Sequence, residues 1–374
     1  MKLPAFGVED WLNTWEKKAS LDISQSTVAA FTLEELLGID GKTSVGDFFS
    51  APAKKPLDYG WIEGSPEFKE LVAGLYKNVA PENVLQTNGA TGANLLVLLG
   101  LIEKGDHVIA LYPSYQQHYD IPRSLGAEVS MLPLLEERGW NPDIDELKSL
   151  IRKNTKLIVL NNANNPTGTI IEEPVMLEIA AAARKVGAWI LVDEVFQSLD
   201  NAVKMTPIAD LYERGISTNS ISKTYSVPGI RIGWTASGSE AAAIFRSLRD
   251  YTLICAGVLD NILAEHVLRN RAAVMERNRR IVLQNLSIFA QWVEQEPRVS
   301  VVMPRAVPVS FVKLDIPQDT EQFCVDLLRD TGVLLVPGSR FGVEGHARLG
   351  YCAHTETLRA GLDALSGYLC KFDG

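Results

Sequence analysis

The stretch KLIVLNNANNPTGTIIEEPVMLEIAAAARKVGAWILVD, residues 156–193, holds the pattern that decides the fold. It begins with the short apolar run KLIVLN (156–161) and passes through the turn sequence NPTG (165–168). A helical pattern, VMLEIAAAARKVG (175–187), then leads to a second apolar run, WILVD (189–193). Two buried strands joined by a helix are typical of a parallel pair in a sheet. We therefore predict a strand–helix–strand unit here.

The same alternation extends to both sides of this unit. Upstream, an amphipathic helix is predicted from Pro66 to Val79, and downstream the helical pattern EAAAIFRSLRDYTL covers 240–253. The intervening runs and helical segments are VLQT (84–87), ANLLVLLGLIEKG (93–105), HVIALY (107–112), EVSMLPL (128–134), DIDELKSLIRK (143–153) and TNSIS (218–222). This order predicts an α/β fold with a mostly parallel sheet that helices cover on both faces.

The two ends of the chain lack this alternation. Roughly the first forty residues, which include Trp11 and Trp15, predict an arm with short helices that packs on another part of the protein. Near the other end, VVMPRAVPVSFVKL (301–314) has β-branched alternation and turn prolines, which favour a smaller α+β domain. We predict three regions: an arm with part of the small domain in 1–45, a large domain in 46–270 and a small domain in 271–374.

Composition limits the partners that this chain can bind. Thirty-six Lys and Arg against forty-six Asp and Glu give a net charge of −10, which disfavours nucleic acid and anionic membranes. The cysteines lack a C-x-x-C spacing, so neither a metal site nor a disulfide framework is predicted; they are Cys255, Cys324, Cys352 and Cys370. The N-terminal stretch MKLPAFGVEDWLNTWEKK has no secretion-signal core, and no apolar run is long enough to span a bilayer. We expect a cytoplasmic protein.

One lysine in SISKTYSVPGIRIGW (220–234) has the surroundings that a reactive amine needs. An amine that forms a Schiff base must lose its proton, although the ordinary lysine pKa is about 10.4. Lys223 follows a short apolar run in a turn rich in Ser, Pro and Gly, and Arg231 lies eight residues later. A nearby cation and partial burial both lower the pKa of a lysine. Taken alone, Lys223 would be interpreted as a solvated loop residue.

Two further polar residues are predicted to lie near Lys223. Asn165 of NPTG and Asp193 of LVDEVF (191–196) each follow an apolar run of the predicted sheet. The carboxyl ends of parallel strands meet at one edge of a sheet, so these side chains are expected to converge there.

The ordered set of NPTG, Asp193, Ser220-x-x-Lys223 and Arg231 resembles the class I and II aminotransferases, which use pyridoxal phosphate (PLP). The resemblance extends from Tyr59 to Tyr351 and implies the fold type I architecture. That fold has a mostly parallel, seven-stranded sheet between helices and a smaller α+β domain. The implied activity is amino transfer from an α-amino acid. Lys223 then forms the Schiff base and moves a proton between the substrate α-carbon and C4′ of PLP.

The resemblance also implies how PLP is held. Asp193 pairs with the ring nitrogen and keeps it protonated, so that the ring accepts electrons. Asn165 hydrogen-bonds the ring O3′, and the Asn165–Pro166 peptide is expected to be cis. Tyr115 of YPSY (112–115) matches an aromatic residue that stacks on the ring at the catalytic centre. The residues implied to bind the phosphate are Gly89, Ala90 and Thr91 of NGATGAN (88–94), with Ser220 and Arg231.

Two more matches concern the substrate and the quaternary structure. Arg348 of HARLGY (346–351) matches the arginine that binds the substrate α-carboxylate, and Asn165 is implied to contact the substrate as well. Tyr59 of YGWIEG (59–64) matches a tyrosine that reaches the phosphate bound by a neighbouring subunit. The implied partners are amino acid and keto acid substrates and a second copy of the chain in a homodimer.

The sequence departs from the family pattern at Phe196, where most members have a tyrosine that donates a hydrogen bond to O3′. Without this donor, the pKa of the Schiff base is expected to rise. In addition, VEDWLNTWEKKASLDISQSTV (8–28) and VLLVPGSRFG (333–342) resemble the subgroup that includes capreomycidine synthase. A PLP-dependent lyase or cyclase therefore stays open as an alternative. A non-catalytic domain is disfavoured because Lys223 is present, and a dinucleotide-binding dehydrogenase because no G-x-G-x-x-G follows the first run.

Overall fold

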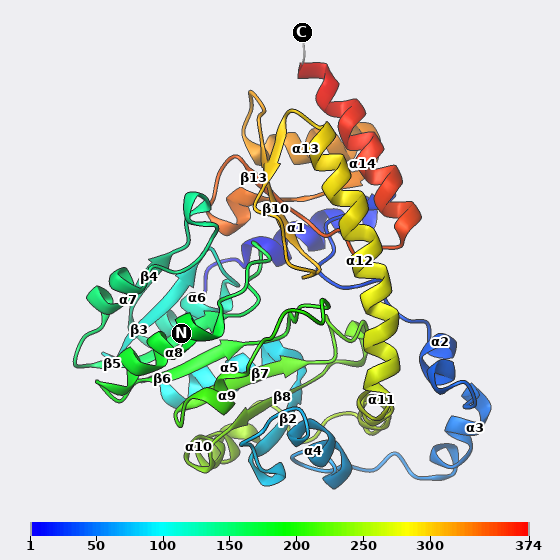
Figure 1. Cartoon of the computed structure of the whole chain (residues 1–374). Coiled ribbons are helices and arrows are strands. Elements are labelled where there is room, and N and C mark those ends of the chain that lie inside the picture. The colour runs from blue at the N-terminus through cyan, green and yellow to red at the C-terminus, as the bar shows by residue number, and fades with distance from the viewer. Residues whose placement is uncertain (1, 373–374) are drawn as a thin grey trace.

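A seven-stranded sheet forms the centre of the larger, lower part of the molecule in the computed structural model, which describes residues 2–372 (Figure 1). Its strand order is β2-β8-β7-β6-β5-β3-β4. The pairs from β7 to β4 are parallel, whereas β8 is antiparallel to both of its neighbours. The strands are β2 (Val84–Asn88), β3 (His107–Tyr112), β4 (Glu128–Pro133), β5 (Thr155–Asn161), β6 (Trp189–Asp193), β7 (Gly215–Ser220) and β8 (Ile232–Ser237).

Helices cover both faces of this sheet because its strands are apolar on both sides. In β5, Leu157 and Val159 belong to one core cluster with α5, α6 and α10. Ile158 and Leu160 belong to a second cluster with α7 and α8. The helices are α5 (Gly89–Leu101), α6 (Gln117–Leu125), α7 (Ile144–Leu150), α8 (Glu173–Arg184), α9 (Ile208–Leu211) and α10 (Ser239–Arg249). The predicted fold class, an α/β sheet between helices with a smaller separate sheet, is confirmed.

The edge formed by β2 and β8 has its own apolar cluster. Phe68 of α4 (Pro66–Ala73) packs edge-on against Trp234 of β8, with ring centroids 6.2 Å apart. Ala264 and Val267 of α11 (Val258–Arg269) join the same cluster. These contacts attach the region that precedes β2 to the main sheet.

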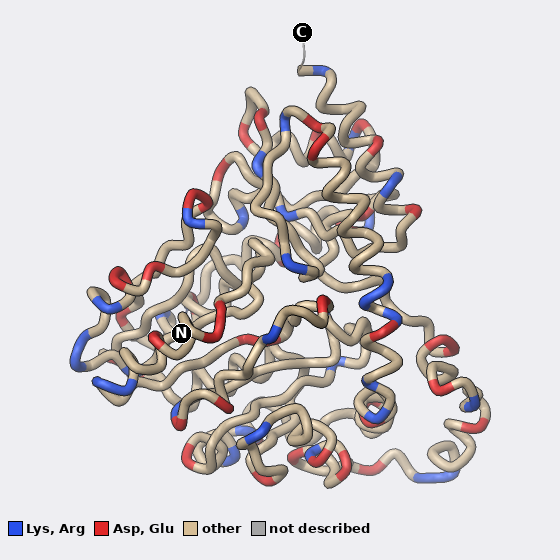
Figure 2. The backbone as a smooth tube through the Cα atoms, in the orientation of Figure 1, with Lys and Arg blue, Asp and Glu red and all other residues tan. Residues whose placement is uncertain are grey.

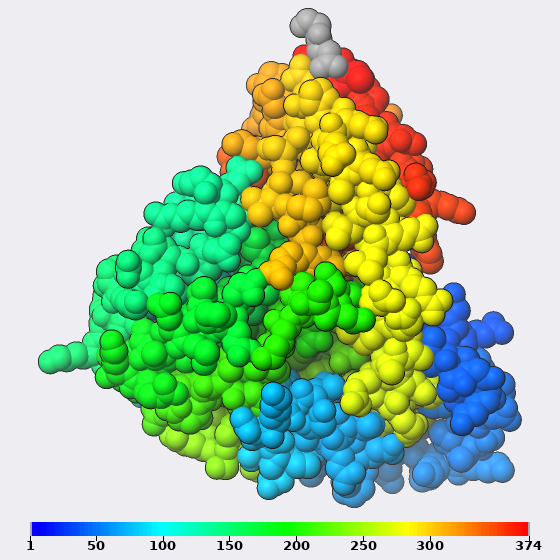
Figure 3. Space-filling view, viewed as in Figure 1, coloured from blue at the N-terminus to red at the C-terminus, as the bar shows by residue number. Residues whose placement is uncertain are grey.

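The smaller, upper part of the molecule contains an antiparallel sheet of order β12-β13-β10-β9 (Figures 1 and 3). The helix α12 runs from the lower part into it. The strands are β9 (Val299–Val301), β10 (Ser310–Leu314), β12 (Val336–Pro337) and β13 (His346–Leu349), and the helices are α12 (Arg271–Gln295), α13 (Thr320–Thr331) and α14 (Thr355–Leu369).

The N-terminal arm packs against this upper part. Its strand β1 (Leu21–Asp22) pairs in parallel with β11 (Val333–Leu334). In α1 (Gly7–Trp15), the Trp11 ring is buried and its Nε1 donates a hydrogen bond to the Leu335 carbonyl at 2.9 Å. The chain then forms the short helices α2 (Leu33–Leu37) and α3 (Val45–Ser50) before it enters the lower part. The arm therefore spans the space between the two parts.

The strands β2 to β6 occupy the predicted runs to within one residue at each end. The strand β7 covers Gly215–Ser220 instead of 218–222, because its polar residues are all buried and apolar alternation does not mark it. The helix predicted from Pro66 to Val79 ends at Ala73, where Gly74 follows as its cap. Within residues 2–372, no helix has the length and apolar character needed to cross a bilayer.

Candidate active site

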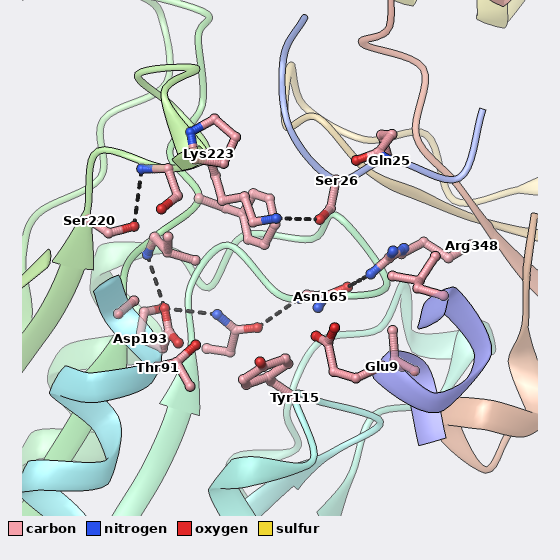
Figure 4. A pocket seen from close by; sticks show the side chains of 18 of the residues that line it. Glu9, Gln25, Ser26, Thr91, Tyr115, Asn165, Asp193, Ser220, Lys223 and Arg348 are labelled. Atoms are coloured by element: carbon pink, nitrogen blue, oxygen red, sulfur yellow. Dashed lines mark hydrogen bonds between the residues drawn. The ribbon is translucent and has the colours of Figure 1, made fainter. Parts of the chain in front are cut away.

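A cavity of about 230 Å³ lies where the carboxyl ends of β5, β6 and β7 face α1 and β13 of the upper part (Figure 4). Side chains from both parts of the molecule and from the arm line it. The predicted site residues among them are Ala90, Thr91, Tyr115, Asn165, Asp193, Ser220, Lys223, Arg231 and Arg348. Tertiary structure therefore brings most of the predicted set into one space.

Lys223 projects its amine into this cavity from the loop after β7 (Figure 4). Its Nζ donates hydrogen bonds to the Ser26 Oγ at 2.8 Å and the Thr27 Oγ1 at 3.3 Å. Burial, and then the positive charge of Arg348, lower the pKa of Lys223 from 10.5 to about 8. A substantial share of this amine is therefore neutral and nucleophilic near pH 8.

Asp193, at the end of β6, is buried and held by three donors or potential donors. Its Oδ2 accepts a hydrogen bond from the Asn94 Nδ2 at 2.7 Å and lies 3.5 Å from the His118 Nε2. Its Oδ1 accepts from the Val195 backbone N–H at 3.1 Å. The Thr218 hydroxyl donates to the Asn94 Oδ1 at 2.6 Å, which turns the Asn94 amide nitrogen toward Asp193. The carboxylate is therefore fixed in one orientation.

Arg348 enters the cavity from β13 and is 3% exposed. Its two terminal nitrogens donate to the Asn165 Oδ1 at 3.2 Å and the Ser24 carbonyl at 3.1 Å. Burial lowers the pKa of Arg348 to about 10, so the guanidinium is still charged at neutral pH. Its Nε has no hydrogen-bond partner within residues 2–372. A buried cation with an unused donor is suited to a carboxylate ligand.

Asn165 is positioned by the loop that follows β5. Its backbone N–H donates to the Asn161 Oδ1 at 2.8 Å, and the Asn161 Nδ2 donates to the Asp193 carbonyl at 2.9 Å. The Asn165–Pro166 peptide is cis, which confirms that prediction. Because the Asn165 Oδ1 accepts from Arg348, its Nδ2 is the atom left to donate to a ligand.

The start of α5 and the loop before β8 together form an anion site. Gly89 has a φ of +68°, and a Cβ there would lie only 2.6 Å from a terminal nitrogen of Arg231. The Arg231 Nη1 donates to the Pro228 carbonyl at 2.8 Å and to the Ser222 hydroxyl at 3.4 Å. Backbone N–H groups at a helix start, a guanidinium and hydroxyl groups are the donors that a phosphate group needs. The residues present therefore fit a phosphate-bearing cofactor.

Two aromatic residues close the cavity. Tyr115 packs between Phe6, at 4.9 Å, and His118, at 5.8 Å between ring centroids. Burial, and then the negative charge of Glu9, raise the pKa of Tyr115 to about 12, so its hydroxyl is protonated at neutral pH. Phe196 is 2% exposed and lines the cavity at the predicted position. Its ring offers no hydrogen-bond donor there.

Several polar residues of the site and its support were missed in the sequence. Asn94 and His118 contact the Asp193 carboxylate. The only sign of this pair in the sequence was that Asn94 is a polar residue beside an apolar segment. Three others, which line the cavity from the arm, carried no local signal and are Glu9, Gln25 and Ser26.

Tyr59 is the predicted site residue that the chain does not bring to its own cavity. Its side chain is 80% exposed, and it is absent from the cavity lining. Gly89 lies behind the lining, against Arg231. The role predicted for Tyr59 depends on a second subunit and stays a prediction.

Comparisons with known proteins agree with this geometry. The family model described as aminotransferase class I and II matches residues 53–365. A solved PLP-dependent aminotransferase from Streptococcus suis is 52% identical, with a TM-score of 0.98 over 100% of both chains. Capreomycidine synthase from Streptomyces vinaceus is 29% identical over 97% of this chain and 93% of that protein. Aspartate aminotransferase from Pyrococcus horikoshii is 29% identical over 82% of this chain and 83% of that protein.

The matched region contains the sheet, the cavity residues of its carboxyl edge and Arg348 of the upper part. The predicted resemblance to the aminotransferases, with the looser likeness to capreomycidine synthase, is confirmed. The protein therefore belongs to the class I and II aminotransferases and is a transferase that uses pyridoxal phosphate.

Proposed function

We propose that Lys223 binds PLP covalently and that the enzyme transfers the amino group of an α-amino acid to a keto acid. The observation that carries this proposal is the position of the Lys223 amine, whose pKa is lowered to about 8, in one cavity with Asp193 and Arg348 (Figure 4). Amino transfer requires an amine, an acid and a cation that binds a carboxylate, and this cavity contains all three.

The bound cofactor supplies an electron-accepting ring that stabilises negative charge at the substrate α-carbon. Asp193, held by Asn94 and His118, would keep the ring nitrogen of that cofactor protonated. With the cofactor and substrate bound, the Lys223 amine would take the α-proton and hold it for delivery to C4′. The hydroxyls of Ser26 and Thr27, which hydrogen-bond the Nζ, orient the amine for this transfer.

Arg348 orients the substrate in this proposal. Its cation and its unused Nε donor bind the α-carboxylate, and Asn165 contacts both the substrate and the ring O3′. Because Arg348 also contributes to the lowered pKa of Lys223, a bound carboxylate that neutralises it would raise that pKa. Substrate binding then favours the lysine as a proton acceptor.

We also propose that the enzyme is a homodimer with shared sites, in which Tyr59 of each chain reaches the phosphate bound by the other. The exposed segment around Tyr59 supports this, because its large apolar side chains are Leu57 at 79%, Trp61 at 62% and Ile62 at 58% exposure. Such a patch is typical of a protein interface. The cytoplasmic location stays a prediction.

The test is a panel of amino acids added to the holoenzyme, with the visible absorption followed and the product identified by mass. Amino donor alone is expected to convert the cofactor to pyridoxamine phosphate and to release a keto acid. Lys223→Ala is expected to lose both the covalent linkage and the reaction, whereas the exposed Lys204→Ala serves as the matched control. An unchanged linkage in Lys223→Ala would refute the proposal.

A second function is a PLP-dependent lyase or cyclase that acts at the β-carbon. The observation that favours it is the likeness to capreomycidine synthase over 97% of this chain. Elimination and ring closure regenerate the aldehyde form of the cofactor, so the pyridoxamine form would not accumulate. Transamination keeps the β-substituent of the donor in its keto acid, whereas elimination or ring closure loses it, so the mass of the product distinguishes the two functions.

A further inference from the structure

One carboxylate of the cavity has no task in the reaction described above. Glu9, in the first turn of α1, points into the cavity between Tyr115 and Arg348 (Figure 4). Glu9 is exposed and its carboxylate is a hydrogen-bond partner of the Tyr115 side chain, but within residues 2–372 it forms no ion pair. Its charge nevertheless acts on the cavity, because it raises the pKa values of Lys223 and Arg348 against the effect of burial.

Every other charged group of the cavity has an assigned partner. Lys223 and Asp193 serve the cofactor, Arg231 serves its phosphate and Arg348 serves the substrate α-carboxylate. No further Lys or Arg of the described chain lines the cavity. Glu9 is therefore the charge left to face the substrate side chain. With Arg348 engaged by the α-carboxylate, a side-chain carboxylate would face Glu9 with no further Lys or Arg of the described cavity lining beside it.

A second acceptor from the arm, Gln25, lines the same cavity. The Gln25 Nε2 donates to the Asp22 Oδ2 at 2.6 Å and to the Glu16 Oε1 at 3.3 Å. Carboxylates only accept hydrogen bonds, so these two contacts fix the orientation of the amide. The Gln25 Oε1 is thereby left as an acceptor at the cavity. The arm presents acceptors and negative charge here, which suit a ligand group that donates.

Apolar residues flank Glu9 on α1. Val8 precedes it and Leu12 follows three residues later, and both line the cavity. Residues at this spacing share one side of a helix. The arm thus offers an aliphatic surface beside a carboxylate. A side chain with methylene groups and a cationic end matches both features.

We infer that the substrate is an α-amino acid with an aliphatic side chain ending in an amine or guanidinium, and that Glu9 binds this cationic end. This inference rests on the proposed function, because it takes the roles of Lys223 and Arg348 from it. It assigns Glu9 as the residue that determines specificity for the side chain.

The first experiment compares amino donors of matched length with the holoenzyme. The donors are L-ornithine, L-lysine and L-arginine, with L-norleucine as the neutral reference and L-aspartate as the acidic one. The cationic donors are expected to exceed norleucine in kcat/KM by roughly 10- to 100-fold, the range of one charge-assisted hydrogen bond. A preference for norleucine or aspartate would overturn the inference.

The second experiment removes the charge with Glu9→Gln, which keeps the shape of the side chain. The kcat/KM for the cationic donors is expected to fall by roughly 10- to 100-fold, while that for norleucine changes by less than roughly 3-fold. Asp10→Asn is the matched control, because Asp10 is the adjacent carboxylate and pairs outside the cavity with Arg340 at 3.2 Å. An equal loss for all donors would show that Glu9 does not select the side chain.

Binding without reaction separates this inference from the proposed function. α-Methylornithine and α-methylnorleucine lack the α-hydrogen, so they bind without amino transfer, and their Kd values can be measured by calorimetry. The holoenzyme is expected to bind α-methylornithine more tightly, and Glu9→Gln is expected to abolish the difference. If no donor in the panel reacts, the proposed function fails while this binding preference still decides the role of Glu9.

Discussion

At the scale of single residues, the reactivity of the site depends on how burial and neighbouring charges act on one amine. Burial makes the largest contribution to the lowered pKa of Lys223, and the Arg348 cation the next. Glu9 and Asp193 act in the opposite direction, which keeps the pKa near 8 instead of lower. Both the protonated form and the neutral, nucleophilic form of the Lys223 amine are therefore populated near physiological pH.

The first prediction concerns the pH dependence of cofactor binding. The protonated amine cannot attack the aldehyde, so the rate of PLP attachment to the cofactor-free enzyme is expected to rise with pH around a midpoint near 8. Arg348→Met removes a positive charge that destabilises the protonated form of Lys223. The pKa of Lys223, and with it the midpoint, is therefore expected to move to higher pH. Stopped-flow absorbance from acid to alkaline pH measures both. A midpoint near the ordinary lysine pKa in both proteins would contradict this expectation.

The second prediction concerns Phe196. Because its ring offers no hydrogen bond to O3′, the linkage between Lys223 and the cofactor is expected to keep its proton above neutral pH. Phe196→Tyr supplies a donor and is expected to lower the midpoint of the visible absorption change by about one pH unit. A native midpoint well below neutral pH, or no shift in the variant, would refute it. Phe196 also belongs to a buried apolar cluster, so the unfolding free energy is measured in parallel to detect any cost of the added hydroxyl.

At the scale of secondary-structure elements, the close approach of β8 to the start of α5 shapes the anion site. A Cβ at Gly233 of β8 would lie 2.4 Å from the Gly89 carbonyl carbon and 2.7 Å from the Ala90 nitrogen. Both positions are backbone, which cannot move aside as a flexible side chain can. The absence of a side chain at Gly233 is therefore what lets the phosphate-binding turn lie against the sheet.

The third prediction tests this contact with a pair of glycine substitutions. Gly233→Ala is expected to lower the unfolding free energy by about 1–3 kcal/mol and to weaken PLP binding, because the added methyl group displaces the backbone of Gly89 and Ala90. Gly229→Ala is the control, since a Cβ there meets no atom within 4 Å. Denaturant unfolding and PLP titration compare the two. Equal PLP affinity in both variants would contradict the role of Gly233.

At the scale of the whole molecule, acidic and basic residues are interspersed along the chain. Figure 2 shows acidic and basic positions mixed over both parts of the chain, and the net charge is −10. Several large exposed apolar residues lie near Tyr59 and in the chain around α11. These two segments are in contact, because a Cβ at Gly60 would lie 3.1 Å from Val258. Tyr251, at 89% exposure, and Ile254, at 54%, extend this apolar surface.

The fourth prediction concerns the proposed dimer. Trp61→Asp places a charge in this apolar surface and is expected to shift the protein to monomers and to lower PLP affinity, because Tyr59 then no longer reaches a neighbouring phosphate. Leu177→Asp is the control, since Leu177 is an exposed apolar residue on α8 and 45% exposed. Sedimentation velocity measures the association. A dimer that persists in Trp61→Asp with unchanged PLP affinity would refute the shared site.

The fold class and the reactive edge of the sheet follow from residues that lie close together in the chain. Residues 156–193 carry a complete strand–helix–strand unit, whose apolar periodicity is local, and Asn165 and Asp193 follow its two strands directly. A parallel sheet collects such strand ends at one edge, so their convergence required no further information. Lys223 was identified in the same way, because it follows a predicted strand. The limits predicted for that strand were wrong, because its buried residues include polar ones that apolar alternation does not mark.

The residues that complete the cavity depend instead on packing between segments that are distant in the chain. Ser26, which hydrogen-bonds the Lys223 amine, lies 197 residues away from it along the chain, and Glu9 and Gln25 come from the same arm. Their positions depend on how the arm packs between the two parts of the molecule, through contacts such as Trp11 with Leu335. Local periodicity records which face of an element is buried, but not which distant element covers it.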